Sequence, residues 1–211
     1  MNIEPTSFPQ YGPRIVCPEQ PWMTEEEQVC FKKWIPRRGR VLEFGMGGST
    51  RLFCETGVEH LTSVESDPSW FFAMQNDPFL AFFIRKARLS LHYADIGSVI
   101  PNRCGLPTGP ASPIWLRYHQ DVWQTFSARQ LDLIFIDGRF RLACACQALV
   151  HCPQKPPMLM HDFLNRPQYH AILNYVDIVD KAGTTAVLVP KKRIKWQSLI
   201  IVLQKTQFDP E

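Results

Sequence analysis

The chain has 211 residues, and 45% of them are hydrophobic, which suits one sizeable globular domain. A net charge of +3 is too small to indicate a nucleic-acid-binding protein. No apolar run approaches the roughly 20 residues that span a bilayer, and the polar, proline-rich N-terminus does not resemble a signal peptide. We therefore expect no membrane partner and disfavour nucleic acid as a partner.

Seven cysteines, an odd number, are scattered through apolar stretches. This usage predicts reduced thiols and a cytoplasmic location rather than a disulfide framework. Cys144 and Cys146, with Cys152 nearby, raise the question of a zinc site. However, residues 139–149 are expected to form a helix, in which side chains two positions apart point about 200° apart. Metal binding by these cysteines is therefore disfavoured.

Short apolar runs alternate with helical patterns along the chain. Helices are predicted after the glycine-rich turn that follows residue 44, after the Asp67-Pro68 pair as far as Pro78, and over 139–149. A further helix is predicted over 166–182, with Asn165 as its N-cap, Pro167 in its first turn and one apolar stripe: Ile172, Leu173, Val176 and Val179. The predicted strands are residues 40–44, 60–65, 89–94, 131–137, 157–162, 185–190 and 198–203.

Alternating strands and helices predict an α/β fold with a mainly parallel sheet and helices on both faces. The loop between the last two predicted strands is too short for a helical crossover, so the seven-stranded sheet should end in a C-terminal antiparallel hairpin with the basic run 191–195 at its tip. Ligands of such sheets bind at the carboxyl edge of the strands. Strand ends are therefore where functional residues are expected.

We expect residues 35–211 to form the main domain and residues 1–34 to form an N-terminal extension that caps a substrate. Residues 97–130 interrupt the alternation as a turn-rich insertion followed by Trp115, Tyr118 and Trp123. A loop of this length inside a compact domain is usually functional or disordered. The aromatic residues fit either a lid or substrate wall, or side chains that pin the loop to the body of the domain.

The turn after residue 44 has the pattern Glu43-x-Gly45-x-Gly47-Gly48-Ser49-Thr50. A phosphate-binding loop is excluded because no lysine follows the glycines, and a dinucleotide fingerprint is weakened because a threonine holds the third glycine position. Glu43 precedes the turn, and Glu65 ends the next predicted strand. Two acidic positions without a phosphate clamp suggest a nucleoside that carries an amino acid.

With these motifs, residues 35–206 resemble the class I, Rossmann-like S-adenosylmethionine-dependent methyltransferases. Residues 62–70 and 134–139 resemble small O-methyltransferases in particular, while 137–145 and 160–170 resemble uncharacterised methyltransferase-like bacterial proteins. The resemblance implies a three-layer sandwich that binds S-adenosyl-L-methionine. It also implies cofactor roles: Glu43, Gly45, Gly47 and Ser49 on the methionine part, Glu65 on the ribose, Asp95 at the adenine, and Asp137 near the methionine part or the reaction centre.

Candidates for the chemistry are Asp137, His161 and Asp162, at the ends of the fourth and fifth predicted strands. In catechol and macrolide-sugar O-methyltransferases, acids at such positions hold Mg²⁺, and Asp137 and Asp162 match two of them. His161 counts against a hard cation and fits a general base oriented by a carboxylate. Both alternatives, and therefore Mg²⁺ as a second cofactor, stay open at this point.

Arg139 and Arg141 flank Phe140 where a helix should begin, and cations there oppose the helix dipole. Either Asp137 neutralises them, or one of them reaches an anionic substrate group. Substrate contacts are predicted for Arg139, Trp115 and Tyr118.

The sequence therefore predicts an S-adenosylmethionine-dependent methyltransferase that acts on an oxygen of a small molecule or sugar. The rivals are a non-catalytic methyltransferase-like binding module and, less well supported, an NAD-dependent oxidoreductase. A homodimer is compatible with the sequence but is not specified by it.

Overall fold

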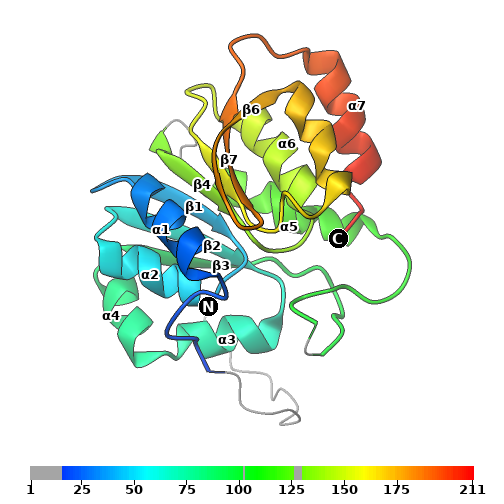
Figure 1. The fold of residues 1–211 in the computed structure, drawn as a ribbon. Coiled ribbons are helices and arrows are strands. Elements are labelled where there is room, and N and C mark those ends of the chain that lie inside the picture. Colours follow the sequence, from blue (N-terminus) through cyan, green and yellow to red (C-terminus); the bar gives the residue numbers. More distant parts are fainter. Residues whose placement is uncertain (1–15, 102, 126–129) are drawn as a thin grey trace.

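The computed structural model describes residues 16–101, 103–125 and 130–211. Its centre is a seven-stranded sheet in the order β3-β2-β1-β4-β5-β7-β6 (Figure 1). The first five strands are parallel, and β7 is antiparallel to both β5 and β6. This confirms the predicted α/β fold. The strands, from β1 to β7, are Arg40–Phe44, His60–Glu65, Leu89–Tyr93, Leu133–Ile136, Met158–Met160, Val176–Ala182 and Thr185–Pro190.

Two helical layers cover the sheet (Figure 1). One face carries α1 (Glu25–Trp34), α2 (Gly48–Thr56), α3 (Pro68–Gln75) and α4 (Pro78–Arg85). The other carries α5 (Arg117–Gln120), α6 (Arg141–His151), α7 (Trp196–Thr206) and the 3₁₀ helices η1 (Pro113–Leu116), η2 (Asp121–Gln124) and η4 (Pro167–Asn174). In the part of the chain that the structure describes, none of the helices is long and apolar enough to cross a bilayer.

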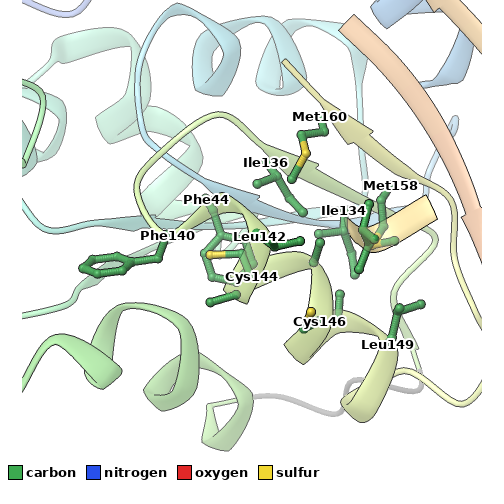
Figure 2. Packing of buried hydrophobic residues seen from close by; sticks show 14 of the residues in the cluster. Phe44, Ile134, Ile136, Phe140, Leu142, Cys144, Cys146, Leu149, Met158 and Met160 are labelled. Carbon is green, nitrogen blue, oxygen red and sulfur yellow. The ribbon is translucent and has the colours of Figure 1, made fainter. Parts of the chain in front are cut away.

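Alternation along the central strands divides the core between these layers. On β4, Phe135 packs with Phe31 and Phe53 on the α1–α2 side, whereas Ile134 and Ile136 face α6. Figure 2 shows the α6 side, where this helix lays an almost wholly buried surface on the sheet. The resulting rigid sheet fixes the position of every loop at its carboxyl edge.

Aspartate N-caps start the two helices after β2. Asp67 accepts hydrogen bonds from the backbone N–H groups of Ser69 and Trp70, and Asp77 accepts one from Leu80 N–H. A proline follows each cap at the first helical position, where its missing N–H costs nothing. The predicted break at Pro78 is confirmed, and a new helix begins there.

The C-terminal part of the sequence prediction was wrong in its elements. Residues 166–182 form η4 with Arg166 as N-cap, followed by strand β6, and residues 198–203 lie inside helix α7. The antiparallel hairpin exists, but it joins β6 to β7, and the basic run 191–195 links β7 to α7.

Two physical causes explain this error in the predicted elements. Edge strand β6 is mostly exposed and bulged between Ile178 and Asp180, so its apolar residues do not alternate. Helix α7 buries only Leu199 and Leu203, and tertiary packing overrides the strand preference of the β-branched residues around them.

The insertion lies against the body of the domain through its aromatic residues. Trp115 and Tyr118 pack on Phe140, and Tyr118 and Trp123 pack on Phe44. Trp115, Tyr118 and Trp123 are buried. The described part of the insertion is therefore pinned to the core, with one isolated bridge between residues 99 and 107 near its start.

Of the predicted N-terminal cap, residues 1–15 lie outside the described residues. Residues 16–24 run over the glycine-rich turn, because a Cβ added at Gly48 would meet the backbone of Gln20 and Pro21. This segment continues into α1, which lies against β6 (Figure 1).

Candidate active site

The glycine-rich turn after β1 is fitted closely to the loop after β4. Gly45 has φ +97°, a left-handed conformation that favours glycine, and a Cβ there would lie 2.7 Å from the Cα of Gly138. Gly47, in contrast, opens toward free space, since an added Cβ would meet only the Trp70 ring at 3.8 Å. The turn therefore leaves room for a ligand at Gly47.

Glu43 lies beneath this turn and is fully buried. Its oxygens accept hydrogen bonds from the hydroxyls of Ser49 (2.6 Å), Thr50 (2.6 Å) and Ser63 (2.5 Å). Burial raises the pKa of Glu43 to about 7, although the three hydroxyls favour the charged form. Glu43 holds the turn to the sheet from behind and does not line the pocket described next.

A pocket of about 290 Å³ opens above the turn at the carboxyl edge of the sheet. It brings together most of the predicted site residues, from the ends of β1, β2, β4 and β5 and from the insertion. Those lining it are Gly45, Gly47, Ser49, Glu65, Tyr118, Asp137, Arg139, His161 and Asp162. Further lining residues include Pro18, Pro21, Trp22, Trp70, Cys104, Arg141 and Arg166.

Glu65 is the acidic residue that reaches the pocket from β2. One oxygen accepts the backbone N–H groups of Ser66 (2.6 Å) and Asp67 (2.8 Å), and the other accepts Met46 N–H at 3.3 Å. Burial raises the pKa of Glu65 to about 7 against these hydrogen bonds. Since a carboxylate oxygen can accept two hydrogen bonds, the second oxygen keeps capacity for a ligand hydroxyl.

Besides Glu43, two predicted residues lie outside the lining of this pocket. Asp95 is exposed, accepts Gly97 N–H and lies 4.0 Å from the Arg117 guanidinium. Trp115 is buried against Phe140. The adenine contact of Asp95 and the substrate contact of Trp115 therefore have no support in this arrangement.

His161 is held between two carboxylates. Its Nδ1–H donates to Asp137 at 3.0 Å, and its Nε2 lies 3.7 Å from Glu27 of α1. Burial opposes the charged imidazolium, but the hydrogen bond to Asp137 and the charges of Asp137, Asp162 and Glu27 outweigh it and raise the pKa of His161. An imidazole oriented in this way can take up a proton from a ligand and hold it.

Asp162 is held by two arginines. Its carboxylate lies 3.3 Å from Arg141 and 2.9 Å from Arg166, and Arg141 also lies 3.1 Å from Asp137. Asp162 has φ +56°, an uncommon conformation outside glycine that aspartate tolerates better than most residues. Arg141 is thus the arginine that the neighbouring acids neutralise, whereas Arg139 binds no carboxylate among the described residues.

No protein-family model and no curated protein sequence matches the chain. Among solved structures, a methyltransferase-like protein from Silicibacter pomeroyi has a TM-score of 0.76 and 26% identity, covering 90% of this chain and 98% of its own. The chain has the fold of class I S-adenosylmethionine-dependent methyltransferases. More distant structures share this methyltransferase fold. A provisionally assigned caffeoyl-CoA O-methyltransferase from Staphylococcus aureus has a TM-score of 0.54 at 15% identity (82% of this chain, 87% of its own), and a provisionally assigned methyltransferase from Escherichia coli has 0.51 at 10% (84% and 92%).

Within the methyltransferase fold, the predicted Mg²⁺ site can be tested on its donor atoms. Asp137, His161 and Asp162 place ligand atoms within 4.8 Å of one another. However, Arg141 contacts both carboxylates, Arg166 contacts Asp162, and the third donor is an imidazole. A hard dication prefers oxygen ligands and is repelled by guanidinium groups. These residues therefore do not fit Mg²⁺.

The same test for S-adenosylmethionine gives a partial fit in this methyltransferase fold. Gly47 offers the open approach that a methionine part needs, and Glu65 offers an oxygen for a ribose hydroxyl. Trp22 and Trp70 form an aromatic pair, 6.0 Å apart, at the same pocket. The residues present fit the methionine and ribose parts, and none of the predicted residues in the pocket accounts for adenine.

Sequence reasoning missed Trp22, Cys104 and Arg166 in the lining of this pocket, and Glu27 beside His161. The spacing Thr24-x-x-Glu27 is a capping-box signal, and the structure forms that box. The signal marks a helix start, however, and gives no indication that Glu27 reaches His161 across the sheet edge.

Proposed function

We propose that this protein is an S-adenosylmethionine-dependent methyltransferase that methylates a hydroxyl of a small molecule or sugar. The observation that carries the proposal is the shared pocket. The glycine-rich turn and Glu65 line its cofactor end, and the Asp137–His161 pair lines its reaction end. Cofactor and acceptor could therefore meet in one enclosed space.

In this proposal, Gly47 and Ser49 contact the methionine part of the cofactor and Glu65 accepts a ribose hydroxyl. Glu43 acts indirectly, because it fixes Ser49 and Thr50 from behind the turn. When bound, the cofactor supplies an electrophilic methyl group on a sulfonium. What the protein adds is the placement of the acceptor oxygen in line with that methyl group.

His161 is the proposed general base. In its neutral form it takes the proton from the acceptor hydroxyl, while Asp137 holds Nδ1–H and thereby leaves Nε2 free to accept. Asp137 and Glu27 stabilise the imidazolium that results. Only the neutral imidazole can accept a proton, so turnover should increase as pH rises through the pKa of His161, which these acids raise.

One observation favours a second candidate, a non-catalytic methyltransferase-like module. Glu65 already accepts three backbone N–H groups, and Glu43 and Asp95 stand outside the pocket. Such a module would keep the fold and bind a partner without turnover. The ordered Asp137–His161–Glu27 arrangement argues for chemistry, because a binding module has no need of an oriented base.

The test is methyl transfer from isotope-labelled S-adenosylmethionine to a panel of hydroxylated acids, phenols and sugars. His161→Asn should lower turnover by about 10²-fold or more, because a general base contributes that much, with binding of S-adenosylhomocysteine retained. His151→Asn, on the exposed end of α6, is the matched control and should leave turnover unchanged. A wild type that binds the cofactor product and methylates nothing would favour the binding module.

We further propose that the acceptor is a small molecule rather than nucleic acid, and that the protein works in the cytoplasm. All seven cysteines are free thiols, which suits a reducing compartment. The proposal requires no second subunit, and a homodimer stays open.

A further inference from the structure

A second cavity opens beside the pocket, and we call it the arginine groove. Its lining residues are Arg103, Cys104, Leu106, Arg139, Arg166 and Glu211. Cys104, Arg139 and Arg166 also line the pocket, so the two spaces meet at these three side chains. Of the three, Arg166 contacts Asp162 at the proposed reaction end, whereas Cys104 is followed by Gly105, which lies against Ser66 and Glu65.

Arg139 is fixed in this groove without being neutralised. Its Nε donates to the carbonyl of Cys104 and its Nη2 to the carbonyl of Arg103, both at 2.8 Å. Carbonyl oxygens orient a guanidinium but leave its charge in place. Among the residues that the structure describes, neither Arg139 nor Arg103 has a carboxylate within salt-bridge distance, in contrast to Arg141, which contacts Asp137 and Asp162.

The groove therefore has a surplus of positive charge. Of the three guanidinium groups that line it, Arg166 is paired with Asp162 at 2.9 Å and lies 3.9 Å from the largely exposed Glu211, so the surplus comes from Arg103 and Arg139. The planar donors of arginine suit the oxygens of a carboxylate or phosphate. Glu211 itself illustrates that a carboxylate can approach the groove from the solvent side.

We propose that the arginine groove binds an anionic group, a carboxylate or a phosphate, carried by the acceptor substrate. Held at Arg139 and Arg103, the anionic group would direct the rest of the acceptor into the pocket toward His161. The assignment of the anion to an acceptor substrate rests on the proposed function. The binding of an anion in the groove is independent of that function.

Cys104 provides a reporter inside the groove. It is the exposed cysteine, and the other six are buried. Iodoacetate and iodoacetamide both react with the thiolate, so the ratio of their rates cancels the thiolate fraction and reports the local preference for an anionic reagent. The reference is the same ratio for a peptide of residues 99–109.

We expect the iodoacetate-to-iodoacetamide ratio at Cys104 to exceed that of the peptide several-fold. Arg103→Gln should lower this ratio while leaving the backbone in place, because among the described residues the Arg103 side chain makes no hydrogen bond or ion pair and only its backbone carbonyl is bonded, to Arg139. Arg139→Gln should lower the rate ratio further, and Glu211→Gln should raise the ratio. Arg193→Gln changes an exposed arginine outside the groove and should leave the ratio unchanged. A wild-type ratio equal to that of the peptide would overturn the proposal.

A protection assay separates the sources of the anion. Inorganic phosphate and benzoate should slow labelling of Cys104 by neutral iodoacetamide, and benzamide should not. The stronger of the two protectors identifies the anion class.

Protection that persists with saturating S-adenosylhomocysteine supports an acceptor site. Protection that the cofactor product abolishes would overturn that assignment, because the cofactor's own carboxylate would then occupy the groove. If S-adenosylhomocysteine does not bind at all, the proposed function fails while the rate ratio still tests the groove.

Discussion

Glu43 and Glu65 are both buried carboxylates whose pKa is raised to about 7 by burial, but only Glu65 reaches the pocket. Their positions at strand ends predicted ligand contacts for both. The prediction could not separate them, because the three hydroxyls that enclose Glu43 come from α2 and β2 and meet only in the folded chain. Arg139 and Arg141 show the same limit, since only the fold reveals which one the acids neutralise.

The raised pKa of Glu65 makes cofactor binding pH-dependent. A ribose hydroxyl donates better to the carboxylate than to the acid, so binding should favour the deprotonated form. We expect the affinity for S-adenosylhomocysteine to rise about tenfold between pH 6 and pH 8. Calorimetric titration across this pH range measures the affinity. Glu65→Gln should bind with an affinity that does not vary with pH, whereas Glu43→Gln should keep the pH dependence. A wild-type affinity that does not vary with pH would contradict the ribose role of Glu65.

Gly45 should be irreplaceable for packing as well as for its conformation. Gly45→Ala combines a left-handed residue, which costs roughly 1–2 kcal/mol, with an overlap on the Gly138 backbone. Gly57 also has a left-handed conformation, at φ +84°, but a Cβ added there meets nothing within 4 Å. Gly57→Ala therefore carries the conformational cost without the overlap. Urea unfolding should show Gly45→Ala as the less stable variant by about 1–3 kcal/mol. Equal stability of the two would contradict the close fit of the two turns.

At the scale of elements, Glu27 ties α1 to the β6–β7 turn. It accepts Thr24 N–H (2.9 Å) through one oxygen and both the N–H (2.8 Å) and the hydroxyl (2.7 Å) of Thr184 through the other. Burial alone would raise its pKa, but these hydrogen bonds and the nearby His161 lower it to about 2. The ionised carboxylate therefore stabilises the packing of α1 on the sheet.

This tie should make stability sensitive to acid. The folded pKa of Glu27 is below its ordinary value of 4.5, so its stabilisation is complete above pH 4.5 and is lost as pH falls toward 2. Glu27→Gln should lower the free energy of unfolding at pH 7 by about 2–3 kcal/mol, with the deficit shrinking below pH 4.5. Glu26→Gln, exposed on the same helix turn, is the control in denaturant unfolding at several pH values. A deficit that does not vary with pH would refute the charged tie.

The sequence predicted elements well where local signals and burial agree. Strands β1 and β2 match their predicted bounds, and the Asp67-Pro68 pair marks the predicted start of α3, whereas at Pro78 only a break was predicted and not helix α4. Prediction failed where an element buries little. In β6 and α7 few residues face the core, so the period of the apolar residues carries no reliable information. Tertiary contacts then decide the conformation.

At the scale of the whole molecule, the site joins segments from both ends of the chain. Glu27 comes from α1, His161 follows β5, and Glu211 lies at the arginine groove. The sheet edge that gathers Glu65, Asp137 and His161 was predictable from strand order. The approach of α1 was not, because helix packing of this kind has no local sequence signal.

The arginines also decide metal dependence. Because Arg141 contacts both Asp137 and Asp162, neither chelator nor millimolar Mg²⁺ should change the melting temperature or turnover. Arg141→Gln, which removes the guanidinium contact of Asp137 and leaves Asp162 with Arg166 alone, should gain a Mg²⁺-dependent rise in melting temperature. Thermal unfolding with and without Mg²⁺ checks both. A rise in the wild type would show that the cation displaces the arginines, contrary to this assignment.

The central claim, that the pocket binds S-adenosylmethionine, is tested most directly by calorimetric titration with S-adenosylhomocysteine. We predict micromolar binding to the wild type and a loss of at least tenfold in Glu65→Ala, with thermal unfolding confirming that the variant is folded. Glu59→Ala, an exposed acid before β2, should bind like the wild type. A folded wild type that does not bind would contradict the account, and equal binding by Glu65→Ala would remove Glu65 from the cofactor site.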